Sequence, residues 1–185
     1  MKIDSCEFYK PLKSKWTAET LLSTQSLWDE RTIVLLGDVF YTKAAMGTIV
    51  HLNANIRFIG RNKKSKYTST PWKELFAVSF EKDSHLALIE SINVAIQDAQ
   101  SGGKGKLWQI YRSLVGLPLN KIEFDSIIFI HIDDFTDDFD SPSEYDASIK
   151  RYEYLTSNNI FKRIWIHLWM LYIDITTTVK NIFGI

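Results

Sequence analysis

The stretch Thr32-Ile33-Val34-Leu35-Leu36-Gly37-Asp38 decides the fold class of this chain. Its first five residues are β-branched or apolar with no polar alternation, and Gly37-Asp38 closes the run. An unalternating run is typical of a strand that is buried on both faces, as in a parallel sheet covered by helices. We therefore predict a buried β-strand over residues 32–36 of an α/β protein.

Strands and helices are predicted to alternate along the rest of the chain. Short apolar runs predict strands over residues 56–59, 75–80 and 126–132. Periodic apolar patterns predict helices over residues 43–52, 83–99 and 106–115. A further helix begins at Ser141-Pro142, because the N-cap serine, the first-turn proline and Glu144 fit a capping box. Alternation of this kind predicts a mainly parallel sheet with helices on both faces.

The composition narrows the class of protein. The chain has 185 residues, of which 45% are hydrophobic, with 22 basic and 22 acidic side chains. This apolar content excludes an intrinsically disordered chain, and the absence of net charge argues against a general nucleic-acid binder. A single cysteine, Cys6, excludes an internal disulfide framework and a cysteine-based zinc cage. No apolar segment follows Met1, so we expect no secretory signal and a cytoplasmic protein.

Carboxylates follow the first and the last predicted strands. Asp38 ends the first strand, and an acid-rich segment from Asp133 to Asp140 follows the last. In open α/β sheets, ligands bind beyond the carboxyl ends of the strands. Carboxylates from two strands could there hold Mg²⁺, which takes one or two protein carboxylates with phosphate oxygens and water. The alternative is that Asp38 is a turn or capping residue and that the later acids form a solvated loop.

Two segments resemble motifs of the sugar-nucleotide pyrophosphorylases and related nucleotidyltransferases, which share the glycosyltransferase-A fold. Residues 28–42 (WDERTIVLLGDVFYT) resemble the central metal-binding strand of that superfamily, and residues 136–146 (TDDFDSPSEYD) resemble its late motif. The resemblance implies that Asp38 and Asp140 bind a catalytic Mg²⁺ or Mn²⁺, with Asp138 as a supporting or exchanging ligand. It also implies that the helix after Pro142 packs on the sheet.

The resemblance implies a metal-dependent nucleotidyltransferase. Its substrates would be a nucleoside triphosphate and a sugar phosphate or similar small phosphorylated acceptor. A glycosyltransferase that uses a nucleotide-sugar is one alternative, and a non-catalytic binding or assembly module that retains the fold is another. The superfamily's glycine-rich nucleotide loop has no counterpart here, because residues 1–28 contain no glycine. We therefore expect an N-terminally shortened relative, which is an enzyme only if its nucleotide site is complete.

Three residues are predicted to contact the substrate. Gly37 precedes the predicted metal ligand Asp38, and Arg61 directly follows a strand end at the start of a predicted basic loop over residues 61–71. A cation at that place could clamp a phosphate, whereas the alternative is a solvated basic loop. His131 lies in the last strand just before the acid-rich segment, where it could orient an acid or touch the substrate. The alternative for His131 is a hydrogen-bonded core histidine.

The C-terminal segment carries a separate prediction. We assign residues 1–156 to the α/β domain and residues 157–185 to an aromatic-rich helical extension. The run over residues 164–173 is uncharged but too short for a membrane span, which needs about twenty apolar residues. Trp165, Trp169 and Tyr172 share a helical face, as in a helix at a membrane surface. The alternatives are a helix that covers the sheet, a contact with a partner protein and a homo-oligomer interface. We therefore expect the protein in the cytoplasm, either free or peripheral to a membrane.

Overall fold

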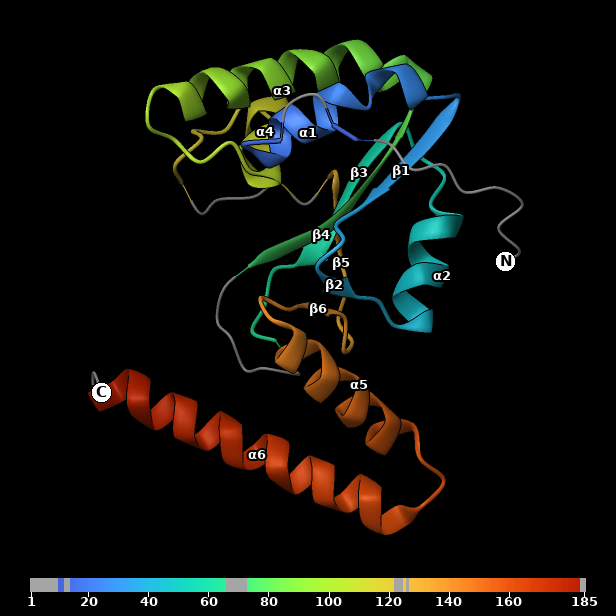
Figure 1. Cartoon of the computed structure of the whole chain (residues 1–185), viewed down its shortest axis with the longest axis vertical. Helices are drawn as coiled ribbons and strands as arrows, with labels where there is room; N and C mark the ends of the chain where they lie inside the picture. The colour runs from blue at the N-terminus through green and yellow to red at the C-terminus, as the bar shows by residue number, and fades with distance from the viewer. Residues whose placement is uncertain (1–9, 12–13, 66–72, 122–124, 126, 184–185) are drawn as a thin grey trace. The chain divides into compact units, whose positions relative to one another are not determined.

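The computed structural model describes residues 10–11, 14–65, 73–121, 125 and 127–183, and it divides into two compact units. Cys6 and residues 66–71 of the predicted basic loop lie outside the described residues. One unit comprises Met1–Thr32 with Phe80–Ile127, and the other comprises Ile33–Ser79 with Ile128–Ile185. Figure 1 shows the elements of both units.

The first unit is mainly helical. It contains α1 (Thr17–Ser23), the 3-10 turns η1 (Gln25–Leu27) and η2 (Lys82–Ser84), α3 (His85–Gln100) and α4 (Leu107–Leu114). The helices predicted over residues 83–99 and 106–115 are thereby confirmed. Their apolar faces meet, as the helical periodicity requires, and bury Leu21, Leu88, Ile92, Ile110 and Tyr111.

The second unit contains most of a four-stranded sheet. The strands β1 (Arg31–Leu35), β4 (Glu74–Glu81), β3 (Ile56–Arg61) and β5 (Phe129–His131) follow one another in that spatial order. A separate two-stranded ribbon pairs β2 (Val39–Phe40) with β6 (Asp137–Asp138) in antiparallel orientation. All the strands predicted from apolar runs are present, although β5 is shorter than the predicted segment over residues 126–132.

The prediction of a mainly parallel sheet is wrong, because the sheet is mixed. Strands β3 and β5 are parallel, with Phe58 opposite Phe129. Strands β1 and β4 are antiparallel, since Lys82 N donates to Glu30 O (3.0 Å) beyond one end and Leu36 N donates to Phe76 O (2.9 Å) beyond the other. Strand β1 is also an edge strand that is only half-buried, with Leu35 exposed. Its β-branched run reflects strand propensity, which does not specify the position of a strand in a sheet.

Helix α2 (Lys43–His51) covers part of the sheet in the second unit and confirms the helix predicted over residues 43–52. The Thr42 side chain caps it by accepting a hydrogen bond from Ala45 N (3.0 Å). The core beneath it combines buried residues of the helix, the strands and the segment after β5, namely Val39, Ala45, Ile49, Ile59, Phe76, Ala77 and Ile132. This packing fixes the start of α2 beside the segment that carries the predicted acids.

Helices α5 (Pro142–Thr156) and α6 (Ile160–Phe183) complete the second unit and pack side by side (Figure 1). Ser141 Oγ accepts a hydrogen bond from Glu144 N (3.3 Å), so the predicted N-cap is confirmed. The Glu144 side chain reaches back to Asp140 N (2.6 Å). Helix α5 also packs against the β2–β6 ribbon, where the rings of Phe40 and Tyr152 lie 5.2 Å apart. Among the described residues, no helix has the length and apolar character needed to cross a membrane.

Candidate functional site

The β2–β6 ribbon brings the two segments that carry the predicted metal ligands side by side. Val39 lies opposite Asp138. Phe139 N donates to Asp38 O (2.8 Å), which extends the pairing by one residue. Neighbouring pairs of an antiparallel ribbon point to opposite faces. The pairing therefore places Asp138 on the face of Val39 and Asp38 on the other face, with Phe139.

An open groove of about 530 Å³ lies beside this ribbon. Two of the predicted site residues line it, Gly37 from the turn after β1 and Asp140 from the segment before α5. The remaining lining comes from Phe139, Ser141, Pro142 and Tyr145. The side chains of Asp38 and Asp140 are both exposed. The groove thus presents one carboxylate and a glycine backbone to solvent, in a wall that is otherwise largely aromatic and apolar.

Asp137 is the most buried acid of this region, and sequence reasoning did not single it out. It is 3% exposed, and Arg61 Nη2 donates to its Oδ1 at 2.9 Å. Ser65 Oγ donates to the other carboxylate oxygen (2.5 Å), and Arg61 Nη1 donates to Lys63 O (3.0 Å). Arg61, predicted as a phosphate contact, is itself 3% exposed and joins β3 to β6. This burial favours a structural role for the guanidinium.

Asp138 has a strongly perturbed carboxyl group. Partial burial, a hydrogen bond with Asp137 and the negative charge of Asp137 together raise the pKa of Asp138 to about 6. Arg61 acts in the opposite direction but more weakly. A carboxyl with this pKa gains and loses its proton close to neutral pH, as a general acid or base requires.

The raised pKa of Asp138 makes a prediction for stability. The folded state holds this proton more tightly than the unfolded state, so stability falls as pH rises from about 4 to about 6. Asp138→Asn removes the titration, and we expect the variant to be about 1–2 kcal/mol more stable than wild type at pH 7.5, after allowance for partial exposure. The difference should vanish near pH 4. Urea unfolding of wild type and the variant across this range measures the difference.

The other residues of the acid-rich segment also have partners. Asn62 N donates to His131 Nδ1 (3.3 Å), which leaves the proton of the neutral ring on Nε2, 3.8 Å from Asp133 Oδ1. Asp134 accepts hydrogen bonds from the Thr42 hydroxyl and from Thr136 N (2.7 Å). Asp134 therefore ties this segment to the start of α2. The alternative of a purely solvated acid loop does not fit Asp134 or Asp137.

A metal site is not preformed in the described part of the chain. It contains no group of three or more histidine, cysteine, aspartate or glutamate side chains arranged to hold a metal ion. Among the lining residues of the groove, Asp140 is the one carboxylate, and it is exposed. A cation bound here would take most of its ligands from water or from a phosphate.

A second surface stands out on α6. Among the side chains of α6 that the structure describes, eight large apolar ones are exposed, including Phe161 at 77% and Trp165 at 56%. Residues spaced three or four positions apart lie on one side of a helix. We call this side the apolar face of α6, and it consists of Ile160, Phe161, Ile164, Trp165, Leu168, Leu171, Tyr172 and Ile175.

The opposite side of α6 packs on α5. Ile166 is 1% exposed, and Trp169 and Met170 are half-buried there. The apolar face offers on the order of 800 Å² of apolar surface, whereas the largest patch of a typical monomer covers roughly 300–600 Å². An exposed patch of that size marks a surface that contacts something else.

Comparisons with protein-family models, with curated proteins and with solved structures found no match.

Proposed function

We propose that this protein is a docking module that attaches to an anionic membrane surface through the apolar face of α6. The observation that carries the proposal is the concentration of eight exposed apolar side chains on one side of a 24-residue helix whose other side packs on α5. A helix that lies in the plane of a membrane surface has this construction, with its apolar side among the acyl chains and its polar side in water.

Two features favour a lipid surface over a second protein. Phe161, Trp165 and Tyr172 are distributed along the apolar face, and aromatic rings of this kind concentrate at the headgroup level of bilayers. Two cationic residues, Lys162 and Arg163, stand in the first turn of α6, next to Phe161 at one end of the face. Each cation near an anionic surface contributes about 1 kcal/mol, so two of them favour anionic over neutral vesicles by on the order of 30-fold.

Vesicle co-sedimentation tests the proposal. The full chain should bind phosphatidylcholine vesicles that contain phosphatidylglycerol and should bind pure phosphatidylcholine vesicles far more weakly. Rising salt should weaken the binding, because screening removes the contribution of the cations. A chain that forms dimers at the same concentrations and stays in the supernatant with both vesicle types would instead assign the apolar face to a second copy and overturn the proposal.

A metal-dependent nucleotidyltransferase is a second candidate function, favoured by one observation. Gly37 and Asp140, which come from the two motifs that resemble that superfamily, line the same groove. The protein would then bind Mg²⁺ or Mn²⁺ weakly, and nucleoside triphosphates poorly without a glycine-rich loop. A glycosyltransferase that uses a nucleotide-sugar is a related candidate function, in which the same acids would hold the metal ion.

Titration with Mn²⁺, followed by its paramagnetic relaxation, tests the metal site. Asp140→Asn should remove most of the bound Mn²⁺, because Asp140 lines the groove, and Asp38→Asn should reduce the binding less, because Asp38 does not line it. Asp133→Asn is the matched control and should change the binding little, because Asp133 lies beside His131 and does not line the groove. Equal binding by all three variants would reject the site, and robust release of pyrophosphate by wild type would establish a catalyst.

A further inference from the structure

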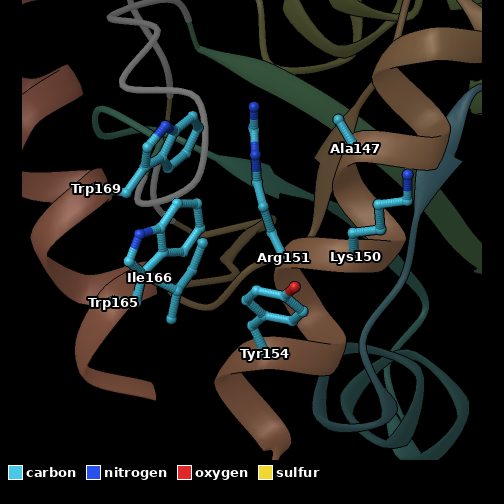
Figure 2. A pocket seen from close by; sticks show the side chains of 7 residues that line it. All are labelled: Ala147, Lys150, Arg151, Tyr154, Trp165, Ile166 and Trp169. Carbon is cyan, nitrogen blue, oxygen red and sulfur yellow. The ribbon is translucent and has the colours of Figure 1, made fainter. Parts of the chain in front are cut away.

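A small pocket lies between α5 and α6, and Trp165 is the residue that this pocket shares with the apolar face of α6. Its volume is about 260 Å³. Figure 2 shows the indole rings of Trp165 and Trp169 on one side, the Tyr154 ring on the other, and the Arg151 side chain extended between the two helices. Ala147, Lys150 and Ile166 complete the lining. Ala147 leaves space where a larger residue on α5 would close the gap.

Contacts with aromatic rings hold positively charged side chains in place at this pocket. The guanidinium carbon of Arg151 lies 4.2 Å from the centre of the Trp169 ring. Lys162 Nζ lies 5.3 Å from the centre of the Tyr154 ring, and that ring meets Trp165 edge-on at 5.9 Å. Cation–π contacts of this geometry hold a charged group over a ring. The apolar walls of the pocket therefore lie next to one positioned cation, Arg151, and Lys162 lies against the Tyr154 ring that forms part of the wall.

The charge decides which class of ligand fits. An aromatic pocket without cations would suit a quaternary ammonium group. Here Arg151 already covers the face of Trp169, and its charge repels a second cation. A phosphate or carboxylate is attracted instead, and arginine forms paired hydrogen bonds with either group. The volume lies just below the roughly 300 Å³ at which typical ligand pockets begin, so it suits a segment of one acyl chain.

We propose that this pocket binds a single anionic amphiphile, with its acyl chain against Trp165, Ile166 and Trp169 and its phosphate or carboxylate on Arg151. Lys150 is a second donor for the head. The inference deepens the proposed membrane docking and rests on it for the source of the ligand, a lipid of the bound membrane. A free fatty acid offers the same chemistry from solution, and the two sources are separated below.

Monomeric short-chain lipids test the pocket without any vesicle. Dihexanoyl-phosphatidylglycerol, below the concentration at which it forms micelles, should bind with a stoichiometry of one and quench or shift the tryptophan fluorescence. Dihexanoyl-phosphatidylcholine and inorganic phosphate alone should bind at least 10-fold more weakly. Tighter binding of hexanoate or octanoate than of the phosphatidylglycerol would assign the pocket to a fatty acid from solution and overturn the membrane source.

Two variants separate the pocket from the apolar face. Ala147→Leu fills the pocket and should abolish binding of the monomeric lipid, and Arg151→Gln should weaken it about 10-fold or more. Circular dichroism measures the helix content and so verifies that each variant folds. If Ala147→Leu does not fold, Arg151→Gln alone tests the pocket. Leu168→Glu, on the apolar face, should bind the monomeric lipid as wild type does. Unchanged binding in the folded Arg151→Gln variant, or equal binding of the phosphatidylcholine by wild type, would overturn the inference.

The outcome of this experiment is independent of vesicle docking. If wild type fails to bind vesicles but binds the monomeric lipid, the proposed function fails and the pocket stands. If wild type binds vesicles and ignores the monomeric lipid, the docking surface stands and the pocket proposal fails.

Discussion

Replacing Asp137 by alanine is expected to lower the free energy of unfolding by about 3–5 kcal/mol, because it leaves the buried Arg61 guanidinium without its carboxylate. Both partners are almost wholly buried, and their nitrogen and oxygen lie 2.9 Å apart. The substitution also removes the acceptor of the Ser65 hydroxyl. A loss of this size is a large fraction of the stability of an ordinary domain, which is about 5–15 kcal/mol.

Urea unfolding followed by circular dichroism measures the loss at Asp137. Asp140→Ala is the matched control, since it removes an exposed carboxylate of the same segment and should change stability by less than about 0.5 kcal/mol. A double variant in which Arg61→Met accompanies Asp137→Leu should recover part of the loss, because no buried charge then remains. Equal effects of the alanine substitutions at Asp137 and Asp140 would show that the ion pair between β3 and β6 does not stabilise the fold.

Leu168→Glu is expected to weaken binding to anionic vesicles by about 100-fold or more. The substitution removes an apolar side chain from the centre of the apolar face. Transfer of that side chain from water into lipid contributes about 1.5–3 kcal/mol to the binding free energy. The substitution also places a negative charge against an anionic surface, at a cost of about 1 kcal/mol. Leu168 is exposed, so the fold should keep its stability.

His167→Glu is the matched control, because His167 is the neighbouring residue on α6, is exposed and lies outside the apolar face. It adds the same acidic group without removing an apolar side chain from the face, and should weaken vesicle binding only about 5-fold through repulsion. Co-sedimentation of the two variants gives the comparison. The same loss of binding in both would mean that charge alone governs the attachment and that no apolar side chain enters the lipid.

The helices could be predicted from the sequence because their signals are local. The 3.6-residue period of α3 and α4, and the Ser141-Pro142 start of α5, depend only on neighbours in the chain. The orientation of the strands could not be predicted in this way. The run Thr32–Leu36 is as apolar as a central strand, yet β1 lies at the edge and runs antiparallel to β4. Which strands become neighbours depends on contacts between distant residues, and strand propensity does not specify them.

The candidate site could be predicted only in part. The two segments around Asp38 and Asp140 do lie side by side, although about one hundred residues separate them in the chain. The sequence could not separate Asp137 from Asp138, since the two are adjacent and identical in type. Their opposite orientation in β6 gives one of them Arg61 and a buried ion pair, and leaves the other half-buried with a raised pKa. Successive side chains of a strand point to opposite faces, so the position of a residue in the strand shows which face its side chain takes only once the strand itself is known.

The measurement that tests the central claim most directly is the depth of single positions on α6 in the presence of anionic vesicles. In a Cys6→Ser background, one cysteine at a time is placed at residues 163, 164, 167, 168, 171 and 175 and labelled with a polarity-sensitive fluorophore. The account predicts that vesicles shift the emission to the blue at positions 164, 168, 171 and 175, where the apolar face enters the lipid, and leave positions 163 and 167 as in water. An emission that stays unchanged at position 168, or that shifts equally at 167 and 168, would contradict it.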